Sequence, residues 1–392
     1  MAVLVLNCGS SSLKFALVEP QTGGRSLQGT LERIGTEGAV LTTRLAAGVE
    51  RVVALPLADH ERALAAVLER LTERGLHREV EGVGHRVVHG GEEFTESVLV
   101  NERVEASITK ACRLAPLHNP ANLAGIRAAR AAFPGVPQVA VFDTAFHQTM
   151  PPRAYRFAVP DAWYRTHGAR KFGFHGTSHR YVAEEAARRL GRPPAELDML
   201  TAHLGNGCSA CAVKRGKSAD TTMGLTPLAG LVMGTRSGDV DPSLVAYMAS
   251  ALGTDAQGVT RELNERSGLL GLSALSNDMR TLLAARDQGH AAAALAIDVF
   301  CHRLSSCLLA LSASLERVDA LVFTAGIGEH AAPVRRQVVE RLWPLGARVD
   351  EEANARHGLP SGCISAEGSV PIWVIPTDEE WMIARDTRLL SG

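Results

Sequence analysis

The same local pattern occurs in both halves of the chain, and this repetition restricts the fold more than any other feature. Residues 2–18 are predicted to form a buried strand, a turn rich in glycine and serine around Gly9, and a second strand. Residues 199–213 repeat that order, with Gly205 at the place of Gly9. The backbone N–H groups and hydroxyls of such turns suit a phosphate. The repetition therefore predicts an internal duplication with a cleft between two similar halves.

Length and charge set the class of protein. At 392 residues the chain exceeds what one ordinary hydrophobic core serves, so two domains are expected. Hydrophobic residues make up 46% of the chain and charged residues 21%, which is typical of a soluble globular protein. The formal net charge of −1 argues against a general binder of nucleic acid or of acidic membranes. Any bound anion must then be held by a few well-placed arginines.

Cysteine usage and the apolar segments indicate the compartment. Seven scattered cysteines without disulfide-like spacing favour a reducing environment. The apolar run at residues 2–6 lacks the basic segment of a signal peptide, and no window approaches the roughly 18 uninterrupted apolar residues of a membrane span. We therefore expect a cytoplasmic protein. The one CxxC pair, Cys208 and Cys211, has no second pair nearby, which argues against a zinc or redox role.

One nucleotide-binding fingerprint nearly occurs in the chain, and a second occurs in full. Gly216-Lys217-Ser218 resembles the end of a P-loop, but the first glycine of that pattern is replaced by Cys211. Residues 326–331 satisfy G-x-G-x-x-A between a predicted strand and a predicted helix, with Asp350 downstream. The motif lies late in the chain and leaves the arginine and histidine loops described next unexplained, which argues against a dinucleotide. A glycine loop of this kind equally suits a mononucleotide.

In the first half, charged residues lie within or directly after predicted buried strands. Arg86 lies inside the apolar strand 83–88, where a buried guanidinium needs an anion or a carboxylate. Asp143 follows the strand 139–142, and the carboxyl ends of strands carry the ligand-facing residues of α/β folds. A structural salt bridge is the alternative role for Arg86.

The second half carries two polar glycine loops. His175 lies between Gly173 and Gly176, just before a predicted helix for which Ser178 is the expected N-cap. Helix N-termini favour anions, so this loop is a candidate phosphate contact, and a solvated histidine in a capped turn is the alternative. Arg236 lies in a second loop of small residues, where it suits a clamp that closes on a ligand or is an exposed loop arginine.

Taken together, these features favour phosphoryl transfer. Backbone amides of the glycine turns cradle phosphates, cations such as Arg86 and Arg236 stabilise the oxygens in transit, and a Mg²⁺ ion held by carboxylates bridges the phosphates. A protein that only binds a ligand would not need so many charges directed at one cleft.

At this point the chain strongly resembles the acetate kinase family, of the acetate and sugar kinase/Hsp70/actin superfamily, over essentially its whole length. The resemblance rests on seven motifs in order, which are Asn7-Cys8-Gly9-Ser10-Ser11-Ser12-Leu13-Lys14, His85-Arg86-Val87-Val88-His89-Gly90-Gly91, Phe142-Asp143-Thr144-Ala145-Phe146-His147, Gly173-Phe174-His175-Gly176-Thr177-Ser178-His179, His203-Leu204-Gly205-Asn206-Gly207, Met233-Gly234-Thr235-Arg236-Ser237-Gly238-Asp239 and Ala325-Gly326-Ile327-Gly328-Glu329.

The resemblance implies an α/β fold of two duplicated, ribonuclease-H-like domains of the actin/Hsp70 type. Each would have a mixed β-sheet flanked by helices, and the active site would lie in the cleft between them. The implied boundaries are 1–147 for the first domain and 148–380 for the second, which would bind nucleotide and form a homodimer. The C-terminal helix, about 381–392, would pack back on the first domain.

The implied reaction is the reversible in-line transfer of the γ-phosphoryl group of ATP to acetate, which gives acetyl phosphate and ADP. By motif, Arg86 would bind acetate and the phosphoryl group, Arg236 would clamp the latter, and His175 would donate to it. Asp143 would orient the substrate or act through Mg²⁺ (or Mn²⁺). Acetate is already ionised at neutral pH, so no strong base is needed. Arginine offsets the repulsion between the two anions without losing its charge.

The remaining implied contacts are with acetate, the metal and ATP. Val88, Leu117, Phe174 and Pro227 match the apolar acetate pocket, and Asn7 and Glu379 the metal site. The nucleotide contacts would be Lys14, His203, Leu204, Gly205, Asn206, Gly207, Asp278, Met279, Arg280, Ala325, Gly326, Ile327, Gly328 and Glu329. Two residues depart from the family pattern. Asp378 stands where Asn is usual and adds a negative charge beside the metal site, and Ala229 stands where Glu is common.

Two alternatives remain at this stage. One is a propionate or butyrate kinase of the same family, because a small apolar pocket discriminates a methylene by only about 1–3 kcal/mol. The other is a non-catalytic, ATP-gated module of the actin/Hsp70 type. The combination of Arg86, Arg236 and His175 argues against such a module, since slow ATP hydrolysis does not need this anion clamp.

Overall fold

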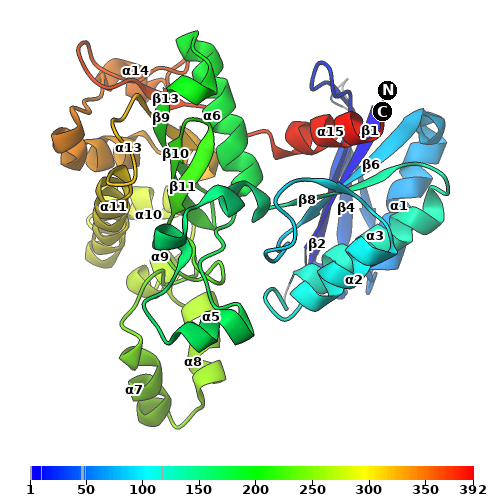
Figure 1. The fold of residues 1–392 in the computed structure, drawn as a ribbon, viewed down its shortest axis with the longest axis horizontal. Helices are drawn as coiled ribbons and strands as arrows, with labels where there is room; N and C mark the ends of the chain where they lie inside the picture. Colours follow the sequence, from blue (N-terminus) through cyan, green and yellow to red (C-terminus); the bar gives the residue numbers. More distant parts are fainter. Residues whose placement is uncertain (1, 10, 46–47, 49, 117) are drawn as a thin grey trace. The chain divides into compact units, whose positions relative to one another are not determined.

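The computed structural model describes the chain except residues 1, 10, 46–47, 49 and 117. It divides into two compact units, Met1–Gln148 together with Asp378–Gly392, and Thr149–Thr377. Figure 1 shows the first unit from blue to cyan with its red C-terminal helix, and the second from green to orange. Ser10 and Leu117, which the sequence assigned to the first glycine turn and the acetate pocket, lie outside the described residues.

The first unit is built on an eight-stranded mixed sheet with the order β5-β4-β3-β2-β1-β6-β8-β7. Strands β1 to β5 form a series of antiparallel pairs, β1, β6 and β8 are parallel to one another, and β7 is antiparallel to β8. In chain order the strands are β1 (Ala2–Cys8), β2 (Ser12–Val18), β3 (Arg25–Glu32), β4 (Val40–Leu45), β5 (Glu50–Ala54), β6 (Val80–Val87), β7 (Val98–Leu99) and β8 (Gln138–Phe142).

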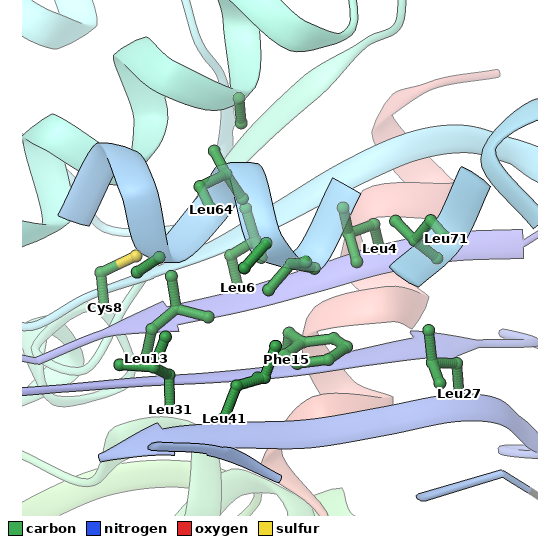
Figure 2. Close-up of a cluster of buried hydrophobic side chains, with 14 of the residues drawn as sticks. Leu4, Leu6, Cys8, Leu13, Phe15, Leu27, Leu31, Leu41, Leu64 and Leu71 are labelled. Atoms are coloured by element: carbon green, nitrogen blue, oxygen red, sulfur yellow. The ribbon is translucent and has the colours of Figure 1, made fainter. Parts of the chain in front are cut away.

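Helices cover both faces of this sheet. On one face Leu64 and Leu71 of α1 pack over Leu4, Leu6 and Phe15, as Figure 2 shows. On the other face Ile383 and Ala384 of the last helix pack against the β1 valines. The α-helices of this unit are α1 (His60–Glu73), α2 (Glu102–Ala111), α3 (Asn119–Ala132) and α15 (Glu379–Leu390), with 3₁₀ turns at Leu76–Glu79 and Ala145–Thr149.

The second unit repeats the central strand order. Its five-stranded sheet runs β11-β10-β9-β12-β13, with an antiparallel half and a parallel half like β3-β2-β1-β6-β8. The strands are β9 (Asp198–Leu204), β10 (Cys208–Lys214), β11 (Lys217–Thr221), β12 (Ala320–Thr324) and β13 (Ile372–Val374). Both predicted hairpins are confirmed, with Asn7 opposite Lys14 in β1–β2 and Leu204 opposite Cys208 in β9–β10.

The longest helix of the second unit is α11, which packs against α9, α10, α13 and β10. Its length and apolar composition alone would let it cross a membrane, but its buried residues face the interior of the unit, as in a core helix. The α-helices of this unit are α4 (Pro152–Tyr155), α5 (Asp161–His167), α6 (Gly176–Leu190), α7 (Ser243–Leu252), α8 (Ala256–Glu265), α9 (Gly268–Ser273), α10 (Met279–Asp287), α11 (Ala291–Ser312), α12 (Ala325–His330), α13 (Ala332–Val339) and α14 (Glu351–Ala355), with 3₁₀ turns at Pro194–Glu196 and Glu340–Leu345.

Two local predictions were wrong. Helix α6 begins at Gly176, so Ser178 lies inside it, and His175 is the N-cap with a left-handed φ of 57°. The left-handed turn starts the helix earlier than the serine signal indicated. Residues 326–329, predicted as a glycine loop, belong to the short helix α12. The first residue of this helix, Ala325, has a left-handed φ of 62°.

Candidate active site

In the first unit, an arginine and two carboxylates meet beyond the ends of the parallel strands. Arg86, on β6, donates from Nε and Nη2 to Asp143 at 2.9 and 2.6 Å. Asp143 directly follows β8 and its side chain is only 2% exposed. Glu379, the first residue of α15, places Oε2 3.8 Å from Arg86 Nε. The strand ends and the start of α15 thus hold these three charges together.

The electrostatics of this cluster suit an anion site. Burial opposes the charge of Arg86, but Asp143 and Glu379 raise its pKa above the usual value. Burial raises the pKa of Glu379, Asp143 and Glu380 add to this shift, and Arg86 and Lys14 oppose it. Within the described chain, Nη1 of Arg86 has no hydrogen-bond acceptor, so this edge of the fixed guanidinium can receive an oxygen of a ligand.

Asn7 and Lys14 face each other across the β1–β2 hairpin. The exposed Lys14 lines a cavity of about 450 Å³ on the polar side of β2, β3 and β4. Glu380 also lines this cavity, so Lys14 lies near the start of α15. Its amino group opposes the raised pKa of Glu379. The hairpin thus places one amide and one cation beside the Arg86 cluster.

In the second unit, a network of hydroxyl groups and histidines fixes His175. Its Nδ1 lies 2.9 Å from Ser209 Oγ, which is also bonded to Nε2 of the buried His179 at 2.8 Å. The ring of His175 stacks on that of His203, with centroids 4.1 Å apart. Ser178 hydrogen-bonds His203 Nδ1 at 2.8 Å, so it supports this stack from within α6. The Nε2 edge of His175 therefore has a defined orientation.

Arg236 lies next to His175. A Cβ placed on Gly207 would lie 3.5 Å from His175 Nε2 and 3.6 Å from Arg236 Nη1, so both groups face this turn residue. Burial lowers the pKa of Arg236, and its one hydrogen bond in the described chain is to Pro227 O at 3.4 Å. A half-buried guanidinium without a carboxylate partner is a site for an anionic ligand.

A cavity of about 460 Å³ lies beside the β9–β10 turn. Seven of the predicted nucleotide residues line it, namely Gly205, Asn206, Asp278, Met279, Arg280, Gly326 and Ile327. The Asn206 side chain accepts a hydrogen bond from Asn277 at 3.0 Å, which fixes its amide. Asp278 caps α10 and is bonded to Arg280, which lowers the pKa of Asp278 to about 2.

Other predicted nucleotide residues within the described chain are not in the wall of this cavity. Leu204 is a fully buried core residue of β9, and His203 stacks on His175. Gly328 packs α12 closely on the sheet, where a Cβ would lie 3.4 Å from the backbone of Phe323. Burial raises the pKa of Glu329, whose carboxylate is bonded to backbone groups of Ala325 and Thr377. Lys14 belongs to the first unit.

Sequence reasoning missed several wall residues and one support. Asn277, Leu283, His330 and Ala331 also line the cavity. The last two belong to the G-x-G-x-x-A motif, which therefore carried a usable signal.

The residue that supports the wall from the interior is Arg335, which is 0% exposed. It donates to the carbonyls of Gly328, Glu329 and Asn354 at 2.8 Å, and thereby ties the C-terminal end of α12 to α14. Neither its burial nor its lack of a carboxylate partner in the described chain was visible from its position in the sequence.

The residues assigned to the acetate pocket belong to both units. Val88 follows β6 and donates its backbone N–H to Asn122 Oδ1 at 3.1 Å. In the second unit, Phe174 is 1% exposed, and the half-buried Pro227 accepts a hydrogen bond from Arg236 through its backbone carbonyl.

Cys208 and Cys211 are buried on β10, and burial raises the pKa of each thiol to about 12, so both are neutral.

Comparison with known proteins adds to this geometry. Residues 2–385 match the family model described as the acetokinase family. The chain is 55% identical to the acetate kinase of Stutzerimonas stutzeri strain A1501, over 99% of this chain and 98% of that protein. It is 52% identical to the acetate kinase of Deinococcus radiodurans, over 100% and 98% of the two chains.

Two solved structures are similar throughout. A propionate kinase from Francisella tularensis matches with a TM-score of 0.95 and 44% identity, over 99% of each chain. The Porphyromonas gingivalis acetate kinase matches with a TM-score of 0.94 and 41% identity, over 100% of each chain.

The buried Arg335, which links α12 to α14, leads to a stability prediction. We expect Arg335→Met to destabilise the protein by roughly 3 kcal/mol or more, because it leaves several buried carbonyls without a donor. Chemical denaturation followed by circular dichroism measures the change. Arg336→Met is the matched control, since the neighbouring Arg336 is exposed and its ion pair with Glu340 is long, at 3.8 Å. Equal stability of the two variants would contradict the role given to Arg335.

Proposed function

The chain belongs to the acetokinase family, and we propose that it is an acetate kinase. It transfers the γ-phosphoryl group of ATP to acetate, reversibly and in line, and forms acetyl phosphate and ADP. The observation that carries the proposal is the placement of Arg236 and His175 against Gly207, at the turn whose neighbours Gly205 and Asn206 line a cavity of nucleotide size. A partly buried cation without a countercharge next to such a cavity suits a phosphoryl group in transit.

Acetate binding is assigned to Arg86. The carboxylate is ionised at neutral pH and needs no general base, but it must approach another anion. Asp143 fixes the Arg86 guanidinium with two hydrogen bonds, which leaves Nη1 for the carboxylate or for the phosphoryl oxygens. Because arginine stays charged, it offsets the repulsion throughout the transfer.

Arg236 and His175 act on the transferring group. Arg236 clamps its oxygens, and His175 donates a hydrogen bond to them from Nε2, the ring nitrogen opposite the one that contacts Ser209. The backbone amides of the β9–β10 turn hold the ATP phosphates. Donors fixed before the reaction stabilise charge without reorganising during it.

Glu379, with Asn7 and through Asp143, would hold Mg²⁺ or Mn²⁺. The residues fit such an ion, because Mg²⁺ typically takes one or two carboxylates together with substrate phosphates and water. The described residues contain no group of three or more His, Cys, Asp or Glu side chains that could hold a metal ion. When bound, such an ion would neutralise part of the phosphate charge.

The adenosine end of ATP is assigned to the wall between α10 and α12. Apolar side chains there, Met279, Leu283 and Ile327, offer a surface for the base, and Asp278 at the N-cap of α10 offers a carboxylate for the ribose. The other predicted contacts of the second unit, including His203 and Glu329, would act on the phosphates or hold this wall in place, and Lys14 of the first unit would act on the phosphates.

A propionate kinase is the second candidate, and the likeness to the Francisella structure is the observation that favours it. Val88, Leu117, Phe174 and Pro227 would limit the length of the acid. A contact of this kind is worth about 1–3 kcal/mol per methylene, so some reaction with propionate is expected.

Hydroxylamine trapping of the acyl phosphate tests the function. With MgATP we expect more acyl hydroxamate from acetate than from propionate or butyrate, and a loss of roughly 100-fold or more for Arg236→Ala, since removing a single charged stabiliser commonly costs that much. A preference for propionate would support the second candidate. No hydroxamate from any acid, together with ATP hydrolysis that acetate does not change, would indicate an ATP-gated module instead.

The protein is further proposed to be a cytoplasmic homodimer formed through the second unit. Helix α7 is apolar, yet none of its side chains is buried, and Tyr247 and Leu252 are 70% and 58% exposed. It packs against α8. A second copy of the chain would cover this apolar surface.

Light scattering after size-exclusion chromatography tests the dimer. We expect twice the chain mass of 41.7 kDa for the unaltered protein and the single mass for Tyr247→Glu, because a charge would be buried at the interface. Leu389→Glu, at a 73% exposed position of the first unit, is the control that should remain dimeric. A dimer that survives Tyr247→Glu would contradict an interface at α7.

A further inference from the structure

Three consecutive acidic residues lie at the N-terminus of α15, namely the N-cap Asp378 and the first two helical residues, Glu379 and Glu380. One carboxylate at a helix N-terminus is favourable, but three adjacent ones repel each other unless a cation is present. The sequence raised the question of Asp378 in particular, because the family pattern has a neutral Asn there.

Arg25, at the start of β3, supplies the cation. Its Nη2 lies 2.6 Å from Asp378 Oδ1 and 3.2 Å from Glu380 Oε2. Burial opposes the charge of Arg25, but the two carboxylates raise its pKa. Arg25 therefore forms ion pairs with the two outer acids, Asp378 and Glu380, whereas the middle acid, Glu379, lies near Arg86.

The same contacts hold the helix start in place. Asp378 Oδ1 also accepts the backbone N–H of Trp381 at 2.9 Å and so caps α15. The Trp381 indole donates to Pro20 O at 2.8 Å, and its ring lies against Gly23, where a Cβ would approach to 3.3 Å. The first turn of α15 is thus fixed to the β2–β3 connection on both sides of Glu379.

We propose that Arg25 is a positioning residue for Glu379, with Asp378 as its partner. Within the described chain, Arg25 forms no hydrogen bond or ion pair with the Arg86 cluster. It pairs with the acids on either side of Glu379, offsets part of their charge and anchors the turn that carries this carboxylate. The negative charge of Asp378 is balanced by Arg25 and is not added to the metal site. The inference rests on the proposed function, in which Glu379 holds the divalent ion.

Binding of Mn²⁺ in the presence of ADP, measured by electron paramagnetic resonance, tests the proposal. We expect Arg25→Met to weaken Mn²⁺ binding roughly tenfold, the lower end of what loss of a partner behind a metal ligand costs. Metal-free binding of ADP should be unchanged, because the nucleotide cavity belongs to the second unit. A role in stability alone would leave the Mn²⁺ affinity of the folded protein unchanged.

Asp378→Asn separates the ion pair from the cap, because asparagine retains a side-chain oxygen for the Trp381 N–H. We expect it to weaken Mn²⁺ binding less than Arg25→Met does. If the pair acts as a unit, the double variant should bind Mn²⁺ about as Arg25→Met does. Arg51→Met, which removes an exposed ion pair with Glu73 elsewhere in the unit, is the matched control.

Unchanged Mn²⁺ binding in Arg25→Met, or equal weakening in Arg51→Met, would overturn the proposal. Hydroxamate formation is followed in the same preparations to separate the two claims. Its absence in the unaltered protein contradicts the proposed function, whereas normal formation with unchanged Mn²⁺ binding in Arg25→Met contradicts the positioning role alone. Should Arg25→Met fail to fold, the Asp378→Asn variant decides, and unchanged Mn²⁺ binding in it then counts against the proposal.

Discussion

The central constraint on this protein is the repulsion between two anions, a carboxylate and a phosphoryl group, that must come together. In the proposed function two arginines offset this repulsion, and the structure holds them in different states. Two hydrogen bonds to Asp143 fix the orientation of the Arg86 guanidinium, and the carboxylates of Asp143 and Glu379 raise its pKa, so it stays charged. Arg236 has no carboxylate partner in the described chain, and burial disfavours its charge. The first is a fixed support and the second a cation that a ligand would satisfy.

The fold makes these positions by repeating one arrangement. In each sheet a hairpin with a tight turn is followed by parallel strands, so that strand ends and turn collect polar residues at one edge. In the first unit this edge carries Asn7, Arg86 and Asp143. In the second it carries Asn206 and Gly207, to which α6 adds His175. Buried polar groups behind the edge, namely Ser209, His179 and Arg335, fix the residues that face outward.

The sequence predicted the main helices and strands and the site residues that belong to a recognisable motif. It did not predict the contacts between distant segments. The hairpins, the strands and the placement of Asp143 after β8 follow from local patterns, and the α/β class is confirmed. The predicted start of α6 was too late in the chain. His175 has a left-handed backbone conformation and is the N-cap, so Ser178 lies inside the helix. Arg335 and Arg25 could not be assigned, because Arg335 also bonds Asn354, 19 residues away, and the acidic partners of Arg25 are 353 and 355 residues away. The roles of Leu117 and the division into duplicated domains stay predictions.

The most direct test of the account asks whether Arg86 and Arg236 bind the group in flight. Fluorine NMR of aluminium fluoride with MgADP and acetate detects a mimic of that group. The account predicts a bound fluoride resonance that requires acetate and is lost in both Arg86→Ala and Arg236→Ala, while ADP still binds to each variant. A bound resonance that persists in both variants, or that forms equally well without acetate, would contradict the account.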